Sequence, residues 1–196
     1  MILPKSKTGL NQNILLGLIT FGAMQNNRIF LIGFMGVGKT TIGKKMANKL
    51  SLPFIDVDQK IEEKFKITIN EFFAKYGEST FRREETNVLN DVISEFENAI
   101  ISVGGGLPCF NDNMSRMNQN GITCYLHRPA KELFQRLVNS KTERPLLKDL
   151  NDEELLLFIE HKLEEREVFY NKASFKFNRN QQEVNEIIKC LGFGHI

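Results

Sequence analysis

Gly33-Phe34-Met35-Gly36-Val37-Gly38-Lys39-Thr40 is the stretch that decides the fold of this chain. It fits the pattern G-x-x-x-x-G-K-[ST], the phosphate-binding P-loop. The apolar run 28–32 before it predicts a buried strand, and residues 41–50 after it carry apolar side chains at helical spacing. Because a P-loop lies between a strand and a helix, these neighbours support the motif.

The residue types of this stretch suit phosphate binding. Glycines allow the backbone to curl tightly and to direct its N–H groups at one centre, and a helix start adds partial positive charge. The Lys39 ammonium can reach the β- and γ-phosphates of a nucleotide, and the Thr40 hydroxyl can bind Mg²⁺. The alternative is an ordinary glycine-rich turn, but a chance match to the pattern has odds of only about one in a hundred.

The composition bounds the class of protein. A length of 196 residues suits one α/β domain with a real core. A net charge of +2 gives no strong electrostatic reason to bind nucleic acid or an anionic membrane, and no apolar run is long enough to span a bilayer. Cys109, Cys124 and Cys190 are far apart and form no C-x-x-C pair, so we expect reduced thiols in a cytoplasmic protein. No interface is evident in the sequence, and we therefore expect a monomer.

Residues 1–25 precede the predicted domain, which we take to run over residues 26–196. The apolar part of this extension, 14–23, resembles a weak signal peptide, but its cleavage-site pattern is poor. We expect the extension to be disordered or loosely docked. Met24 is a second methionine that could start the chain, in which case the extension would not belong to the natural product.

Apolar runs and helical patterns alternate along the chain, which predicts a parallel sheet covered on both faces. The chain is therefore assigned to the α/β class, with no internal repeat and no second domain boundary. Strands are expected at 28–32, 53–58, 99–103, 122–126 and 175–177. Helices are expected at 41–50, 59–76 in two pieces, 78–96, 111–120, 129–138, 152–173 and 182–191.

Two candidate ligand-binding segments lie at the carboxyl ends of predicted strands, the edge of a parallel sheet where ligands bind. Asp56 and Asp58 alternate at the end of strand 53–58, so both carboxylates would face one side, one suiting Mg²⁺ and one a substrate hydroxyl. The alternative is that Asp58 caps the following helix. Gly104-Gly105-Gly106 follows strand 99–103 and allows a ligand very close to the backbone, although a loop could use it for a turn.

Several arginines are candidates for binding anions. Arg82 and Arg83 are adjacent on a helix and point about 100° apart, so one of them is expected to face a site, and the residues alone do not say which. Arg144 lies in the polar loop 139–151, which could close as a lid over a transferred phosphoryl group, the alternative being a plain surface loop. Arg166 is a further candidate, but it has glutamates around it in the sequence. The alternative interpretation is therefore that Arg166 forms an exposed ion pair, which contributes little to stability.

Six motifs occur in order between residues 27 and 191, and their combination is highly specific. They are the P-loop, Phe54-Ile55-Asp56-Val57-Asp58, Gly77-Glu78-x-x-Phe81-Arg82-Arg83-x-Glu85, Ser102-Val103-Gly104-Gly105-Gly106, Arg144-Pro145-Leu146-Leu147 and Arg166-x-x-x-Tyr170. In this combination the chain resembles the shikimate kinase family. The resemblance implies a three-layer P-loop kinase fold with a five-stranded parallel sheet of order 2-3-1-4-5. It also implies transfer of the γ-phosphoryl group of ATP to the 3-hydroxyl of shikimate with Mg²⁺, in chorismate and aromatic amino acid biosynthesis.

By the same resemblance, the P-loop and its neighbours would bind the nucleotide. Thr40 would bind Mg²⁺, and Asp56 would approach the ion through water. Lys39 and Arg144 would supply positive charge at the γ-phosphoryl group, and Arg179 is the candidate for a family arginine that contacts adenine. The phosphates would be held by Gly36, Val37, Gly38, Lys39, Thr40 and Thr41.

The resemblance also implies a shikimate site formed by Asp58, Arg82, Gly105 and Arg166. The two arginines would grip the carboxylate with their forked donors, and Asp58 would bind hydroxyls and orient the attacking one. Two rival interpretations are a kinase of the same fold for gluconate or a nucleoside monophosphate, and a nucleotide-dependent binding module without catalysis. The pairing of Asp58, Arg82 and Gly105 disfavours a gluconate kinase, and the complete set of catalytic candidates disfavours a binding module.

Overall fold

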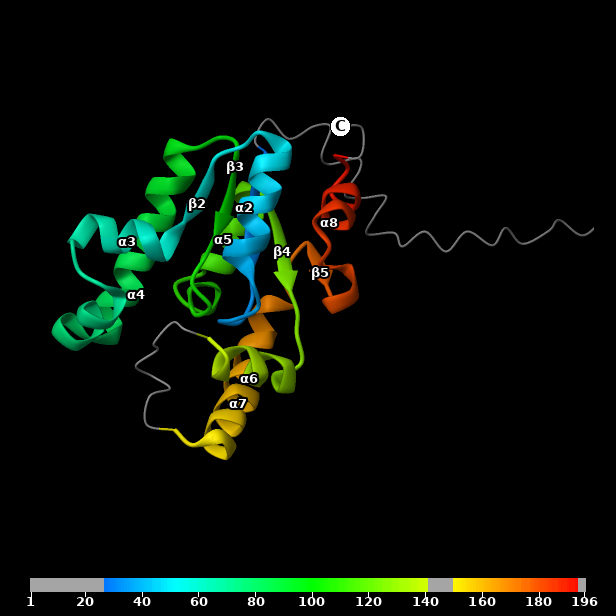
Figure 1. Ribbon diagram of the computed structural model, residues 1–196. Coiled ribbons are helices and arrows are strands. Elements are labelled where there is room, and N and C mark those ends of the chain that lie inside the picture. Colours follow the sequence, from blue (N-terminus) through cyan, green and yellow to red (C-terminus); the bar gives the residue numbers. More distant parts are fainter. Residues whose placement is uncertain (1–26, 141–149, 194–196) are drawn as a thin grey trace, which may run out of the picture.

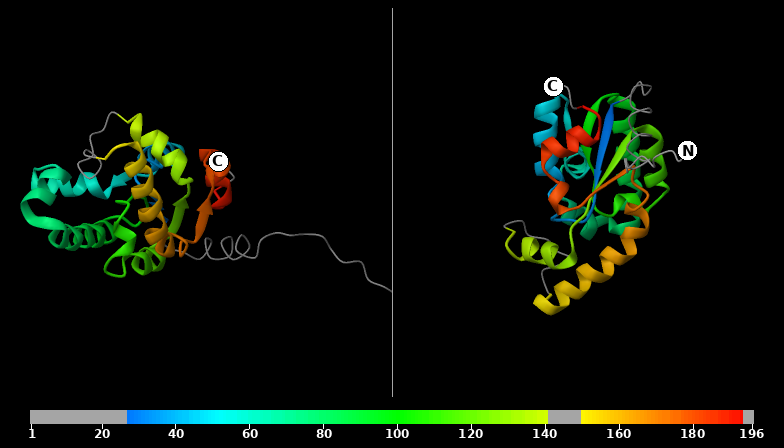
Figure 2. Two further views of the ribbon diagram at one scale, coloured as in Figure 1. Left: turned by 90° about the horizontal axis from the view of Figure 1, so that it is seen from below. Right: turned by 90° about the vertical axis from the view of Figure 1, so that its right-hand side faces the viewer.

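A computed structural model describes residues 27–140 and 150–193 of the chain. Its centre is a parallel sheet of five strands in the order β2-β3-β1-β4-β5, with helices on both faces (Figures 1 and 2). This confirms the predicted α/β class, the three layers and the strand order. The predicted extension 1–25, and Arg144 with most of the loop 139–151, lie outside the described residues.

The strands follow the apolar runs of the sequence. Every residue of β1, β3 and β4 is buried, which is why these strands read as continuous apolar runs and do not alternate. All strand pairs are parallel, so the carboxyl ends of the strands meet at one edge. The strands are β1 (Arg28–Ile32), β2 (Phe54–Asp56), β3 (Ala99–Ser102), β4 (Ile122–Leu126) and β5 (Phe175–Phe177).

The helices form the two outer layers. Helices α2 and α8 cover one face of the sheet, and α4 and α5 lie on the other, as the views in Figures 1 and 2 agree. The α-helices are α2 (Lys39–Leu50), α3 (Val57–Phe65), α4 (Ile69–Glu95), α5 (Asn113–Asn120), α6 (Ala130–Val138), α7 (Asp152–Tyr170) and α8 (Val184–Cys190). Two short 3₁₀ helices are η1 (Leu107–Cys109) and η3 (Arg179–Gln181).

The second strand is shorter than predicted, and this changes the argument about its carboxylates. Strand β2 ends at Asp56, and Asp58 lies in the first turn of α3. The alternation argument for Asp56 and Asp58 was therefore wrong. Asp56 is the residue that caps the helix, because its side chain accepts a hydrogen bond from the backbone N–H of Asp58 at 3.2 Å.

The predicted break between two helices near Lys66 is present, but the next break is only a kink. Lys66 ends α3 in the left-handed conformation, and Thr68 starts α4 with a capping box that includes Glu71. Helix α4 then continues to Glu95 through Gly77, whose backbone is not helical (φ 76°, ψ 169°). The kink lies five residues before Arg82.

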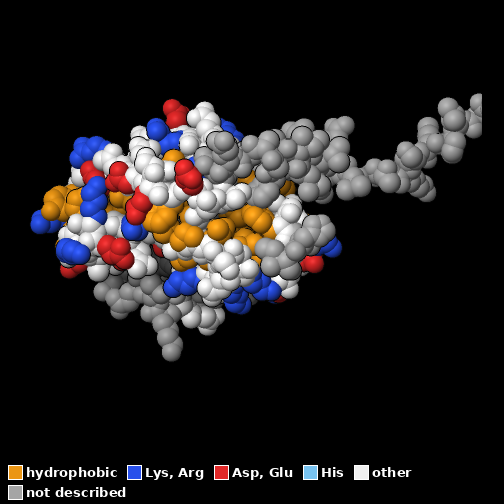
Figure 3. Space-filling view, turned by 90° about the horizontal axis from the view of Figure 1, so that it is seen from above, with side chains coloured by type: hydrophobic (Ala, Val, Ile, Leu, Met, Phe, Trp, Pro, Cys, Tyr) orange, Lys and Arg blue, Asp and Glu red, His pale blue; other side chains and the backbone are white. Residues whose placement is uncertain are grey.

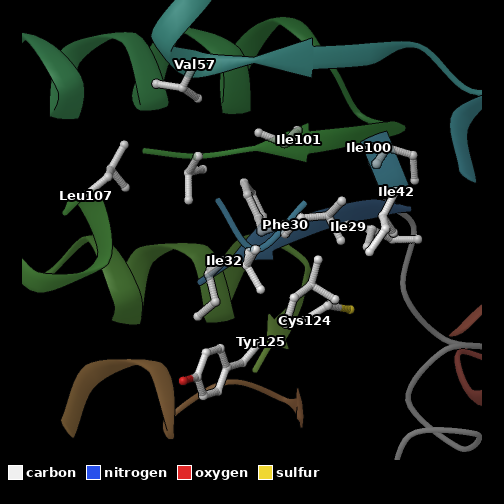
Figure 4. Close-up of a cluster of buried hydrophobic side chains, with 14 of the residues drawn as sticks. Ile29, Phe30, Ile32, Ile42, Val57, Ile100, Ile101, Leu107, Cys124 and Tyr125 are labelled. Atoms are coloured by element: carbon white, nitrogen blue, oxygen red, sulfur yellow. The ribbon is translucent and has the colours of Figure 1, made fainter. Parts of the chain in front are cut away.

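The core holds the central strands in register. Ile29 and Phe30 of β1 pair with Ile100 and Ile101 of β3, and all four side chains are fully buried (Figure 4). Ile42 of α2 packs onto them from one side of the sheet. Because this packing holds the strands in place, the loops that follow their carboxyl ends start from fixed positions.

The end of the molecule opposite the P-loop carries charges of both signs around a group of hydrophobic side chains (Figure 3). This mixture agrees with the small net charge of +2. Within the described ranges, no helix is both long enough and apolar enough to cross a membrane.

Candidate active site

The P-loop connects β1 to α2 at the carboxyl edge of the sheet. Gly33 (φ 140°), Gly36 (φ 79°) and Gly38 (φ 109°) have backbone angles that favour glycine, and a Cβ at Gly33 would lie 2.6 Å from the carbonyl oxygen of Leu126. Gly38 caps α2, whose first turn contains no acidic residue. The first N–H groups of this helix and its positive dipole end are therefore available to an anion.

Lys39 lies over the loop that precedes it. Its ammonium group donates to the carbonyl oxygens of Gly33 at 2.8 Å and Phe34 at 3.2 Å. The charge is thus held against the P-loop backbone, and Lys39 lines the cavity described next. This is a position from which it can contact the phosphates of a bound nucleotide.

One cavity of about 580 Å³ brings together the candidate residues from three strand ends. The P-loop and the start of α2 form one wall, the end of β2 contributes Asp56, the first turn of α3 contributes Asp58, and the loop after β3 contributes Gly105. The lining residues are Met35, Gly36, Gly38, Lys39, Thr40, Thr41, Asp56, Asp58, Ser102, Val103, Gly105, Arg136, Leu137, Asn139 and Ser140.

Thr40 and Asp56 form the oxygen pair that fits Mg²⁺. The Thr40 hydroxyl donates to Asp56 Oδ2 at 3.0 Å, although the two residues belong to different elements. The described residues contain no group of three or more His, Cys, Asp or Glu side chains arranged so that they could hold a metal ion. A hydroxyl with one carboxylate suits Mg²⁺, which keeps several waters and takes phosphate oxygens as its other ligands.

Asp58 has an unusual electrostatic environment. The pKa of Asp58 is raised to about 6, mainly because burial removes water from its carboxyl group and also because the Asp56 charge is close. Lys39 and Arg82 act in the opposite direction and favour the ionised form. Asp58 therefore lies within the electrostatic reach of both the nucleotide candidate Lys39 and the substrate candidate Arg82.

The choice between Arg82 and Arg83 is settled by burial. The side chain of Arg82 is 14% exposed, whereas that of Arg83 is 68% exposed. Residues 104–106, three glycines that follow β3, are called the glycine loop below. A Cβ at Gly106 would lie 2.6 Å from Arg82 Nη1, so the guanidinium group packs directly on this loop. Phe110 stacks on the same group, with Cζ 4.6 Å from the ring centre.

Glu85 is a buried carboxylate to which the sequence analysis assigned no role. It is 1% exposed, and burial raises its pKa to about 7 although Arg82 opposes the shift. A Cβ at Gly104 would lie 2.7 Å from Glu85 Oε1 and 2.8 Å from Asp58 Oδ1. The two carboxylates thus flank one glycine. The sequence signal was the spacing of Glu85, three residues after Arg82 on the same helix face.

Arg166 faces the glycine loop, and it forms no ion pair with another residue of the described ranges 27–140 and 150–193. Its Nη1 would lie 3.4 Å from a Cβ at Gly105, and its guanidinium group lies over the Phe34 ring at 5.3 Å. The neighbouring Glu165 pairs with His161 and Lys162. Arg82 and Arg166 therefore approach the same loop from α4 and α7.

Two arginines, Arg136 and Arg179, are candidates for the nucleotide side of the cavity, and only Arg136 lines it. Arg136 of α6 lines the cavity, and its Nε donates to the carbonyl oxygen of Gly36 at 2.7 Å. Arg179, the candidate for the adenine contact, is not among the lining residues. Its side chain is 64% exposed and pairs with Glu132 at 3.1 Å. Sequence reasoning missed Arg136, because a lone arginine in an amphipathic helix resembles any surface charge.

The chain is similar in sequence to known shikimate kinases. A family model described as "Shikimate kinase" matches residues 35–191. A shikimate kinase of Azobacteroides pseudotrichonymphae is 49% identical over 164 residues, which cover 84% of this chain and 96% of that relative.

Two solved structures are similar to most of this chain. The crystal structure of shikimate kinase from Bacteroides thetaiotaomicron has a TM-score of 0.78 and 46% identity, covering 85% of this chain and 95% of that one. The structure of shikimate kinase from Acinetobacter baumannii in complex with shikimate has a TM-score of 0.73 and 34% identity, and the match covers 87% of this chain and 93% of that one. Because the family model matches residues 35–191 and a relative that is 49% identical is covered over 96% of its length, the chain belongs to the shikimate kinase family.

Proposed function

We propose that this protein transfers the γ-phosphoryl group of ATP to the 3-hydroxyl of shikimate, in chorismate and aromatic amino acid biosynthesis. The observation that carries the proposal is the shared cavity. A P-loop with Lys39 forms one wall, and Asp58 and Gly105 form another. Arg82 and Arg166 do not line this cavity but lie against Gly106 and Gly105, next to it. A nucleotide phosphate and an acceptor hydroxyl at Asp58 could therefore share one space, with the two arginines beside it.

The nucleotide half of the site would act through charge and orientation. The N–H groups from Gly36 to Thr41 and the Lys39 ammonium would bind the phosphates. Thr40, and Asp56 through water, would hold Mg²⁺, which supplies positive charge between the β- and γ-phosphates. Arg144, outside the described residues, is proposed from its motif to cover the transferred group.

The nucleotide base would lie beyond the P-loop. Arg136 is close to Gly36 and is the described cation that lines this part of the cavity. We therefore propose Arg136, in place of Arg179, as the arginine on the adenine side.

The acceptor half would bind shikimate by its two kinds of polar group. Arg82 and Arg166 would each offer forked donors to the carboxylate, and the backbone at Gly105 leaves room for the ring because it carries no side chain. Asp58 would accept a hydrogen bond from the attacking hydroxyl and orient it toward the γ-phosphoryl group. With a pKa of about 6, this carboxyl is mostly ionised at pH 7 and can accept that bond.

We also propose that the enzyme works as a cytoplasmic monomer without nucleic acid or membrane partners. The net charge of +2 offers no strong attraction to polyanions. Light scattering of the purified protein tests the oligomeric state.

A coupled assay of ADP release tests the reaction. We expect ADP release that depends on shikimate and on Mg²⁺, and a phosphorus NMR signal from a shikimate phosphate ester. Gluconate and a nucleoside monophosphate, the substrates of the rival kinases, serve as control acceptors. ADP release at the same rate with either control, or with no acceptor, would contradict the proposed function.

A further inference from the structure

We propose that Tyr170 is a positioning residue for shikimate, because its hydroxyl ties the glycine loop to Arg166. The inference rests on the proposed function and extends it to a residue that does not line the cavity. Tyr170 is the last residue of α7 and is fully buried. It lies four residues after Arg166, so the two side chains project from the same face of the helix.

The hydroxyl of Tyr170 has partners on both sides. It donates a hydrogen bond to the carbonyl oxygen of Gly105. The guanidinium group of Arg166 also has a hydrogen-bond contact with the Tyr170 side chain. Since guanidinium groups only donate, Tyr170 accepts from Arg166 and donates to Gly105, which places one hydroxyl between the two.

This bond controls more than one atom of the loop. The carbonyl of Gly105 belongs to the planar peptide that joins Gly105 to Gly106, so holding its oxygen fixes that whole peptide unit. Gly106 packs against the Arg82 guanidinium group, where a Cβ would lie 2.6 Å from Nη1. One hydroxyl therefore sets the position of Arg166 and of the surface on which Arg82 lies.

A glycine loop needs such an anchor. Gly104, Gly105 and Gly106 have no side chains of their own to hold the loop, and glycine loses the most conformational freedom on folding. A phenylalanine at position 170 would fill the same buried space without the polar group. The hydroxyl is instead retained in a buried site, where every polar group needs a partner. Burial raises the pKa of Tyr170, so the hydroxyl keeps its proton and remains a donor.

Tyr125 offers a matched control. It is 1% exposed, and its ring centre lies 5.0 Å from that of Tyr170. Its hydroxyl donates at 2.9 Å to Glu167, which also lies 3.5 Å from His127 and is not among the residues that line the cavity. Removing this hydroxyl thus deletes the same group at the same burial, without touching Gly105 or Arg166.

The experiment compares Tyr170→Phe and Tyr125→Phe with the parent enzyme. Thermal unfolding, KM for each substrate, kcat and calorimetric binding of shikimate alone are measured for each protein. We expect both variants to fold and to lose similar stability. Tyr170→Phe should weaken shikimate binding and raise its KM by about tenfold, the effect of one hydrogen bond, with the KM for ATP within twofold. Tyr125→Phe should leave both constants unchanged.

A second measurement uses the Arg166→Lys background. If Tyr170 acts through Arg166, adding Tyr170→Phe to Arg166→Lys should weaken shikimate binding by clearly less than tenfold. Equal effects of Tyr170→Phe and Tyr125→Phe on shikimate binding, or no effect of Tyr170→Phe, would overturn the positioning role. A parent enzyme that does not bind shikimate would instead overturn the proposed function itself.

Discussion

Arg82 Nη1 donates to Glu85 Oε2 at 2.6 Å across one turn of α4, and the side chain of this glutamate is only 2% exposed. Glu78 holds the same guanidinium group from the opposite direction, accepting from Nη2 at 2.9 Å. Phe110 covers its face. Arg82 is therefore fixed in one orientation before any ligand arrives, so little side-chain freedom remains to be lost on binding.

The first prediction concerns the substrate carboxylate. Arg82→Lys and Arg166→Lys keep the charge and lose the planar fork, so each should raise the KM for shikimate by roughly tenfold to a hundredfold while the KM for ATP changes little. Arg83→Lys is the matched control, because its side chain is exposed on the next position of the helix. Steady-state kinetics with each substrate varied in turn provides the test. A large effect of Arg83→Lys with a harmless Arg82→Lys would show that the assignment is shifted by one residue.

The second prediction concerns the glycine loop. Gly106 has ordinary backbone angles (φ −89°, ψ −25°), so alanine there is unstrained, but its Cβ would lie 2.6 Å from Arg82 Nη1. Gly106→Ala should therefore displace Arg82 and raise the KM for shikimate about tenfold.

Gly77→Ala is the comparison variant, and it is expected to leave shikimate binding unchanged. No atom lies within 4 Å of a Cβ at Gly77, but its φ of 76° strains any other residue by about 1–3 kcal/mol. Stability should fall while both KM values stay near those of the parent. Urea unfolding and kinetics on both variants separate the two effects, and a stability loss confined to Gly106→Ala would refute the argument.

The third prediction concerns pH. The pKa of Glu85 is raised from 4.5 to about 7, chiefly by burial, so the folded protein binds a proton more tightly than the unfolded chain does. The stability from this group is therefore present below pH 4.5 and is lost as pH rises through about 7, on the order of 3 kcal/mol.

Urea unfolding at pH 5 and pH 8, without nucleotide, measures this dependence. Glu85→Gln should reduce the difference between the two pH values by most of that amount. Glu78→Gln is the control. This change also removes a negatively charged partner of Arg82, but the Glu78 side chain is exposed, whereas that of Glu85 is buried. If Glu85→Gln kept the parent difference, Glu85 would not be the group responsible.

The fourth prediction concerns the nucleotide. Lys39→Met removes the cation that lies over the P-loop, so kcat should fall at least about a hundredfold while the protein stays folded. Lys45→Met, on an exposed position of the same helix, should retain near-normal kcat. Circular dichroism and kinetics together test this. A folded Lys39→Met enzyme with near-normal turnover would remove Lys39 from the catalytic set.

The sequence by itself determined the features that depend on neighbouring residues. The P-loop pattern from Gly33 to Thr40 and the apolar runs predicted the strands, most of the helices and a phosphate site, because backbone conformation and amphipathic periodicity are local properties. The order of the strands came from the resemblance to a family and not from any local pattern.

Other features were decided only by the tertiary structure, because they depend on contacts between residues far apart in the chain. Burial against the glycine loop distinguishes Arg82 from Arg83, which have the same charge and the same helix. The raised pKa of Glu85 and the anchoring bond of Tyr170 to Gly105 likewise arise where α4 and α7 pack on that loop. Desolvation and hydrogen-bond geometry are set by this packing, and no periodicity in the sequence encodes them.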